Sequence, residues 1–190
     1  MVAAILLAAG HSSRFQHSNP KLFVKFGSKT LIEIIIDKFL DIKAIDQITL
    51  VNNNSKYFDD IKVKYKDKLL FIKGGEERQD SVRMALNTID ETKYSKILIH
   101  DAARYNCSKE LILSVLQQLD NHQAVIPILP MIDTVKILDT HKKLINSTLD
   151  RSKLGLAQTP QGFNLKLIKD LHNNDKFNIA TDDASLCEEN

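Results

Sequence analysis

Small residues followed by cations stand near the N-terminus. Ala8, Ala9 and Gly10 end an apolar stretch, and Arg14 and Lys21 come shortly after them. Small residues let a backbone approach a ligand closely and direct its N–H groups at phosphate oxygens. The two cations could stabilise the charge that develops when the α-phosphate of a nucleoside triphosphate is attacked. The pattern is neither GxxxxGK[ST] nor GxGxxG, which disfavours a P-loop or a dinucleotide-binding site.

A pair of glycines opens a predicted helix in the middle of the chain. Gly75 is followed by the letters EERQDSV, which include Asp80 and Ser81. The first N–H groups of a helix have no partner within it, so they could bind the edge of a base or an anion. An ordinary helix start, with its two glutamates complementing the helix dipole, explains these letters equally well.

A carboxylate comes directly after an apolar stretch at 96–99. Asp101 follows His100, and Arg104 is three residues further on. Open α/β sheets bind ligands at the carboxyl ends of their strands, so Asp101 could hold a Mg²⁺ ion that bridges triphosphate oxygens. Arg104 could compensate a nearby phosphate. Alternatively, Asp101 and Arg104 form a surface ion pair.

Three residues in the second half of the chain could hold a phosphate together. Thr134 and Thr159 offer hydroxyls, and Arg151 offers a guanidinium fork. Two hydroxyls and one fork suit a phosphate group because its oxygens accept several hydrogen bonds. Each of the three residues, taken alone, also fits an ordinary surface position.

Short apolar stretches alternate with longer amphipathic ones, which is typical of a parallel sheet covered by helices. We therefore expect an α/β fold. Two strands around a polar segment at 139–143 predict a hairpin that projects as an arm at about 134–157. Strands of the sheet are expected at 2–7, 47–51, 69–72, 96–99 and 124–128. Helices are expected from the Thr30 capping box, at 55–66, at 82–89, after Ser108, at 164–172, and at 182–188 from a Thr181 cap.

The length, charge and cysteines of the chain indicate its domain number, its partners and its compartment. A chain of 190 residues predicts a single domain, and 26 basic against 24 acidic residues give no reason to expect binding to nucleic acid or membranes. Cys107 and Cys187 lack the spacing of a metal site and indicate thiols in a reducing compartment. The apolar N-terminus has no basic flank and is too short to span a bilayer, so we expect a cytoplasmic enzyme.

Seven segments in combination resemble one family. They are AAG, GGEERQDSV, HDAAR, DTVK, TLDR, QTPQGF and TDDAS, and the resemblance that includes them extends from Ile5 to Ser185. The chain resembles the 2-C-methyl-D-erythritol 4-phosphate cytidylyltransferases of non-mevalonate isoprenoid biosynthesis, although AAG is shared with the wider sugar-nucleotidyltransferase superfamily. The resemblance implies a three-layer, Rossmann-like nucleotidyltransferase fold. It also implies transfer of the cytidylyl group of CTP to the sugar-alcohol phosphate, giving a CDP-sugar alcohol and pyrophosphate, with no protein nucleophile.

The resemblance implies roles for particular residues. Arg14 and Lys21 would stabilise the α-phosphate during transfer, and Asp101 would bind Mg²⁺ or another divalent cation. The family is a homodimer whose arms cross, so that Thr134 and Arg151 would serve the neighbouring site. Nucleotide binding would fall to Ala8, Ala9, Gly10, Gly75, Asp80 and Ser81, and binding of the acceptor phosphate to Arg104, Thr134, Arg151 and Thr159.

The sequence departs from the family pattern at three places. Tyr105 stands where proline is usual, and Ile132 replaces a usual basic residue. Family chains continue past the TDDAS segment into a strand and a phosphate-contacting lysine, which leads us to expect weak CTP binding and slow turnover here. The alternatives are a ribitol-5-phosphate cytidylyltransferase, a non-catalytic sugar-nucleotide-binding homologue, and the N-terminal half of a bifunctional enzyme.

Overall fold

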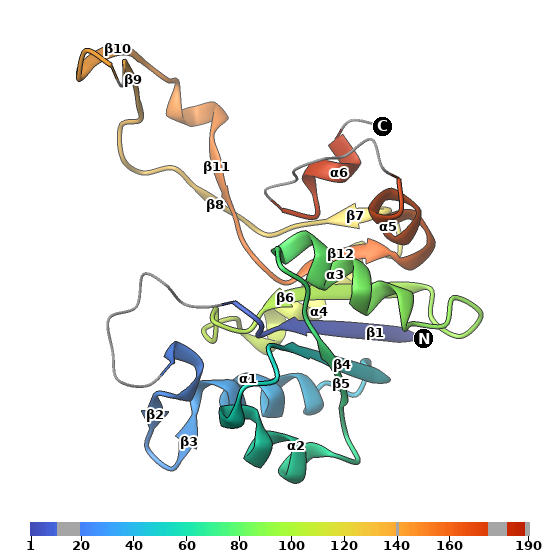
Figure 1. Cartoon of the computed structure of the whole chain (residues 1–190). Coiled ribbons are helices and arrows are strands. Elements are labelled where there is room, and N and C mark those ends of the chain that lie inside the picture. Colours follow the sequence, from blue (N-terminus) through green and yellow to red (C-terminus); the bar gives the residue numbers. More distant parts are fainter. Residues whose placement is uncertain (11–19, 140, 175–181, 189–190) are drawn as a thin grey trace.

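The computed structural model describes residues 1–10, 20–139, 141–174 and 182–188. Its centre is a six-stranded sheet in the order β5-β4-β1-β6-β12-β7 (Figure 1). Strands β5, β4, β1 and β6 are parallel, whereas β12 is antiparallel to both of its neighbours. The expected α/β fold with a mainly parallel sheet is confirmed. The strands are β5 (Leu70–Lys73), β4 (Gln47–Asn52), β1 (Val2–Leu7), β6 (Lys96–Asp101), β12 (Gln161–Asn164) and β7 (Ala124–Val125).

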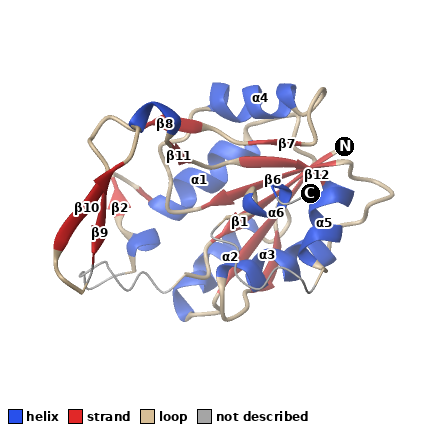
Figure 2. Cartoon of the chain, turned by 90° about the horizontal axis from the view of Figure 1, so that it is seen from above, coloured by secondary structure: helices blue, strands red, loops and turns tan. Residues whose placement is uncertain are grey.

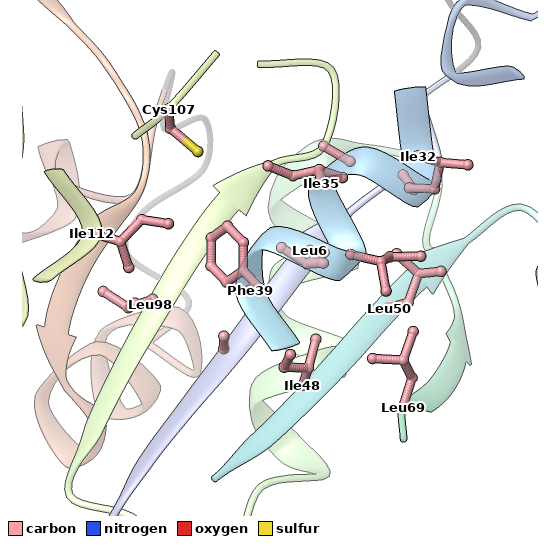
Figure 3. Close-up of a cluster of buried hydrophobic side chains, with 14 of the residues drawn as sticks. Leu6, Ile32, Ile35, Phe39, Ile48, Leu50, Leu69, Leu98, Cys107 and Ile112 are labelled. Carbon is pink, nitrogen blue, oxygen red and sulfur yellow. The ribbon is translucent and has the colours of Figure 1, made fainter. Parts of the chain in front are cut away.

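Helices cover both faces of the sheet, which accounts for its almost continuous apolar strands. Alternate residues of β1 enter different cores because successive side chains of a strand point to opposite faces. Ala4 and Leu6 pack with α1 (Leu31–Leu40), α2 (Asp59–Tyr65) and α4 (Lys109–Gln118), in the cluster shown in part in Figure 3. Ala3 and Ile5 pack with α3 (Arg78–Asn87), α5 (Leu165–His172) and the residues around α6 (Ser185–Glu188). The result is three layers.

The helices begin where their capping residues predict. The Thr30 backbone N–H donates to the Glu33 carboxylate at 2.7 Å, and the Glu33 N–H donates to Thr30 Oγ1 at 3.4 Å. This is the expected capping box of α1. Ser108 caps α4 by accepting from the Leu111 N–H at 3.1 Å. Helix α2 is shorter than expected because a 3-10 turn, η2 (Lys56–Phe58), precedes it.

The prediction of one continuous strand at 124–128 is wrong, because two separate strands occupy this segment. Pro127 lacks a backbone N–H, and the ladder is interrupted there. Only β7 joins the sheet, whereas β8 (Ile128–Pro130) pairs with β11 (Gly155–Ala157) at the base of the arm. The arm ends in the antiparallel pair β9 (Lys136–Asp139) and β10 (Leu144–Thr148), and it extends away from the sheet (Figures 1 and 2).

Two C-terminal elements differ from expectation. Strand β12 was not predicted, and it packs so closely on α4 that a Cβ at Gly162 would lie 2.6 Å from Val115 Cγ1. The expected helix at 182–188 is reduced to α6, whose first residue, Ser185, donates its N–H to Asp182 Oδ1 at 3.1 Å. Thr181, the expected cap, lies outside the described residues.

Both cysteines are free thiols, in agreement with the prediction. Burial raises the pKa of Cys107 and of Cys187. Within the described ranges, none of the helices has the length and apolar character that crossing a bilayer requires.

Candidate functional site

A cavity of about 550 Å³ opens at the carboxyl ends of β1 and β6, and we call it the main cavity. This is the edge at which open α/β sheets bind their ligands. The structure therefore brings together residues from three sequence segments that the chemistry singled out separately. The predicted residues that line the main cavity are Ala9, Gly10, Lys21, Gly75, Ser81, Asp101 and Arg104.

Glycines allow the two predicted nucleotide-binding segments to touch. A Cβ at Gly74 would lie 2.6 Å from Ala9 Cβ, and a Cβ at Gly75 would lie 2.4 Å from Asp80 Cβ. Neither distance is compatible with a side chain, so the loop after β5 can fold back only with glycine. The Gly75 N–H donates to Ser81 Oγ at 3.1 Å, which fixes the loop on the start of α3.

Two predicted nucleotide-binding residues do not line the main cavity. Ala8 is buried, and its N–H donates to the Val51 carbonyl at 2.8 Å. Asp80 accepts from the Glu77 N–H at 3.3 Å and pairs with Arg83 at 2.8 Å, so it caps α3. Glu76 lines the cavity instead, which the letters alone did not indicate because a glutamate at a helix start suits the helix dipole.

The predicted catalytic cations are only partly described. Lys21 begins the 3-10 helix η1 (Lys21–Phe23), directly after Pro20, and lines the main cavity. Arg14 lies outside the described residues.

A second cavity of about 260 Å³ adjoins the first and shares Arg78, Asp101 and Arg104 with it. Thr159 also lines this second cavity and is buried, with Oγ1 accepting from the Asp101 N–H at 3.3 Å. Arg104 contacts Asp101 Oδ2 through Nε at 3.3 Å and donates to Gln158 Oε1 at 2.7 Å. The site that the sequence assigned to the acceptor phosphate thus adjoins Asp101.

His100 supports this arrangement from the core. Burial lowers the pKa of His100 to about 4, so the imidazole is neutral at pH 7. Its Nδ1 lies 2.9 Å from Thr159 Oγ1, and its Nε2 lies 3.7 Å from Cys107 Sγ. His100 therefore fixes Thr159 and adds no charge beside Asp101.

Arg78 is a site residue that the sequence did not reveal. Its Nε donates to Asp101 Oδ1 at 3.2 Å, and a terminal nitrogen donates to Asp183 Oδ2 at 2.8 Å. Asp183 is buried and lies 2.9 Å from His172 Nε2. Burial acts to raise the pKa of Asp183, but the hydrogen bond from His172 and the charge of Arg78 outweigh burial and lower it. Arg78 lies in the GGEERQDSV segment and Asp183 in the TDDAS segment. The two residues are too far apart in sequence for a local spacing pattern to predict their contact.

Thr134 and Arg151 lie on the arm, and neither lines the two cavities. Arg151 is exposed and donates to the Ile132 carbonyl. The arm extends away from the sheet (Figure 1), so the structure does not bring these two residues to the cavities of their own chain.

The donor set at Asp101 fits Mg²⁺. Over the ranges that the structure describes, there is no group of three or more His, Cys, Asp or Glu residues that could hold a metal by itself. Mg²⁺ typically takes one or two protein carboxylates and completes its shell with substrate phosphates and water. Asp101, with 30% of its side chain exposed at the junction of the two cavities, can supply such a carboxylate.

Known proteins are similar to this chain over nearly its whole length. The family model for 2-C-methyl-D-erythritol 4-phosphate cytidylyltransferase matches residues 2–190. An enzyme of that name from Dictyoglomus thermophilum is 39% identical, over 98% of this chain and 83% of its own. A bifunctional enzyme IspD/IspF from Pelagibacter ubique is 37% identical, over 96% of this chain and 48% of its own.

Solved structures agree with the sequence comparison. The crystal structure of 4-diphosphocytidyl-2C-methyl-D-erythritol synthase from Anaerococcus prevotii has a TM-score of 0.83 and 29% identity, over 99% of this chain and 81% of that one. The fold, the order of the motifs and the family model therefore agree, and the chain belongs to the 2-C-methyl-D-erythritol 4-phosphate cytidylyltransferase family.

Proposed function

We propose that this chain transfers the cytidylyl group of CTP to 2-C-methyl-D-erythritol 4-phosphate. One observation carries the proposal: two adjoining cavities share Asp101, Arg78 and Arg104. The small residues Ala9, Gly10 and Gly75 and the cation Lys21 line the main cavity, and they suit a nucleoside triphosphate. The second cavity can hold a phosphate beside it. Two anionic substrates can thus meet at residues that include two arginines.

The main cavity binds the nucleotide in this proposal. Backbone at Ala9 and Gly10 and the fold-back loop at Gly75 and Ser81 contact the cytidine, while Lys21 faces the α-phosphate. An oxygen of the acceptor phosphate attacks the α-phosphorus and forms a new P–O bond. The bond from the α-phosphorus to the oxygen bridging to the β-phosphate breaks, and pyrophosphate leaves with the electron pair.

Asp101 would hold Mg²⁺ or another divalent cation, together with oxygens of CTP. When bound there, such an ion would neutralise charge on the triphosphate. Arg104 and Thr159 orient the acceptor phosphate in the second cavity. Thr159 also accepts from the Asp101 N–H. This hydrogen bond would fix the position of the acceptor phosphate relative to the Asp101 carboxylate.

A pyrophosphate-release assay tests the proposed function. The protein is incubated with CTP and Mg²⁺, and with either methylerythritol phosphate or ribitol phosphate as acceptor. We expect release that depends on methylerythritol phosphate. Release only with ribitol phosphate would replace the acceptor, and release with neither would indicate a non-catalytic sugar-nucleotide-binding homologue.

We also propose a homodimer formed through the arm, acting in the cytoplasm. Ile137, Leu138, Leu144 and Ile145 are exposed by 41–65% near the end of the arm. Apolar side chains gathered on a projecting hairpin favour burial against a second copy. In that dimer, Thr134 and Arg151 would reach the partner's second cavity.

A mixing experiment tests this assignment. Arg151→Ala should raise the KM for the sugar-alcohol phosphate roughly 10- to 100-fold, because a charge-assisted hydrogen bond is lost. Mixing it with a Lys21→Ala protein should restore normal kinetics at about a quarter of the sites, since exchanged dimers hold one site with Lys21 from one chain and Arg151 from the other. Differently tagged chains verify subunit exchange. If activity stays flat after exchange, both residues act within one chain.

A further inference from the structure

Asp101 is shared between two arginines at the junction of the two cavities. Its Oδ1 lies 3.2 Å from Arg78 Nε, and its Oδ2 lies 3.3 Å from Arg104 Nε. Charge-assisted hydrogen bonds are usually about 2.7–2.9 Å, so both contacts are long. A carboxylate that must accept a divalent cation cannot also be fully occupied by guanidinium groups.

Arg78 is held more closely on its other side. A terminal nitrogen lies 2.8 Å from Asp183 Oδ2, and Asp183 Oδ1 lies 2.9 Å from His172 Nε2. The side chains of Asp183 and His172 are each 1% exposed, so this anchor is fixed within the core. The Asp183 carboxylate can only accept, which requires the proton on His172 Nε2.

The anchor joins three elements on one face of the sheet. Arg78 begins α3, His172 ends α5, and Asp183 lies just before α6 (Figure 1). Because a terminal nitrogen of Arg78 donates to Asp183, the guanidinium donates to Asp101 only through Nε. An arginine without such an anchor tends to pair with a carboxylate bidentately, through two parallel N–H donors.

We propose that the buried Asp183–His172 pair keeps the Arg78 fork from closing on both oxygens of Asp101. Among the described residues, Oδ2 then contacts only Arg104, at 3.3 Å, and stays accessible to a divalent cation. Arg78, Asp183 and His172 are then positioning residues for the metal carboxylate. The proposal rests on the proposed function, because it takes Asp101 as the residue that binds the ion with CTP.

The test measures how strongly Mg²⁺ and CTP bind together, without acceptor and hence without turnover. Calorimetry gives the Kd of CTP with and without Mg²⁺, and the ratio of the two values is the coupling. Asp183→Asn should reduce the coupling at least tenfold and change the Mg²⁺-free Kd less than threefold. The double variant Arg78→Gln/Asp183→Asn should return the coupling to within threefold of wild type, because no fork remains to close.

Arg83→Gln is the matched control, since Arg83 lies on the same helix, pairs with Asp80 and does not line the cavities. Its coupling should equal that of wild type. Arg78→Lys decides the question independently if Asp183→Asn fails to fold: an ammonium cannot pair bidentately, so the coupling should be equal to or above that of wild type.

Coupling that is unchanged in Asp183→Asn, not restored in the double variant, or lost tenfold in Arg78→Lys would overturn the proposal. A role of Asp183 in folding alone would weaken CTP binding equally with and without Mg²⁺. If the wild-type protein releases no pyrophosphate, the proposed function fails, while the coupling ratios still decide whether Asp183 governs the metal carboxylate.

Discussion

Replacing Lys21 with alanine should lower kcat roughly 10²- to 10³-fold while changing the affinity for CTP much less. Lys21 lines the main cavity, as do Gly10 and Asp101. In the proposed mechanism this cation acts mainly on charge that develops during the attack on the α-phosphate, rather than on the ground-state complex. The loss should therefore appear in kcat.

Steady-state kinetics with CTP and methylerythritol phosphate provide the measurement. Lys25→Ala is a suitable control because Lys25 is exposed on β2 (Lys25–Phe26), four residues from Lys21, and does not line the cavities. Near wild-type kcat in Lys21→Ala would remove this lysine from the mechanism. A large rise in the Kd for CTP with unchanged kcat would limit it to ground-state binding.

Much of the fold follows from local rules. Buried parallel strands need continuous apolar residues, and β1, β4 and β6 were predicted on that basis. The Thr30 capping box correctly predicts the start of α1, because the side chains of Thr30 and Glu33 each accept a hydrogen bond from the other residue's backbone N–H. Strand β12 escaped because it begins directly after Pro160, is only four residues long and contains Gly162.

The candidate site was partly predictable because parallel strands deliver their carboxyl ends to one edge. Asp101 and the Ala9–Gly10 segment lie at the same cavity for this reason. Asp80 does not line the main cavity, because it accepts from the Glu77 N–H at the start of α3. An ordinary helix start was the alternative that the sequence explained equally well. The Arg78–Asp183 pair was beyond prediction, since only the packing of α3, α5 and α6 on one face brings the two side chains together.

The arm shows a different limit of sequence reasoning. Its hairpin was predicted from two strands around a polar segment, and β9 and β10 confirm it. The proposed roles of Thr134 and Arg151 require a second copy of the chain, so neither local pattern nor the fold of one chain decides them. They remain predictions until subunits are mixed.

Replacing Asp101 with asparagine should lower kcat roughly 10²- to 10³-fold at a Mg²⁺ concentration that saturates the wild type. Asparagine keeps the size of the side chain and one acceptor oxygen, so the variant should fold. It loses the negative charge that attracts the cation, and part of the activity should return as Mg²⁺ is raised. Titrating Mg²⁺ in the pyrophosphate-release assay measures the shift.

Asp120→Asn is the matched control, because Asp120 is an exposed carboxylate that pairs with Lys96. Lys96 begins strand β6, and Asp101 ends it. Its Mg²⁺ titration should match that of wild type. A kcat loss in Asp101→Asn that no Mg²⁺ concentration relieves would point to the ion pairs with Arg78 and Arg104 as the cause. An unchanged Mg²⁺ titration would show that Asp101 is only a surface ion-pair residue.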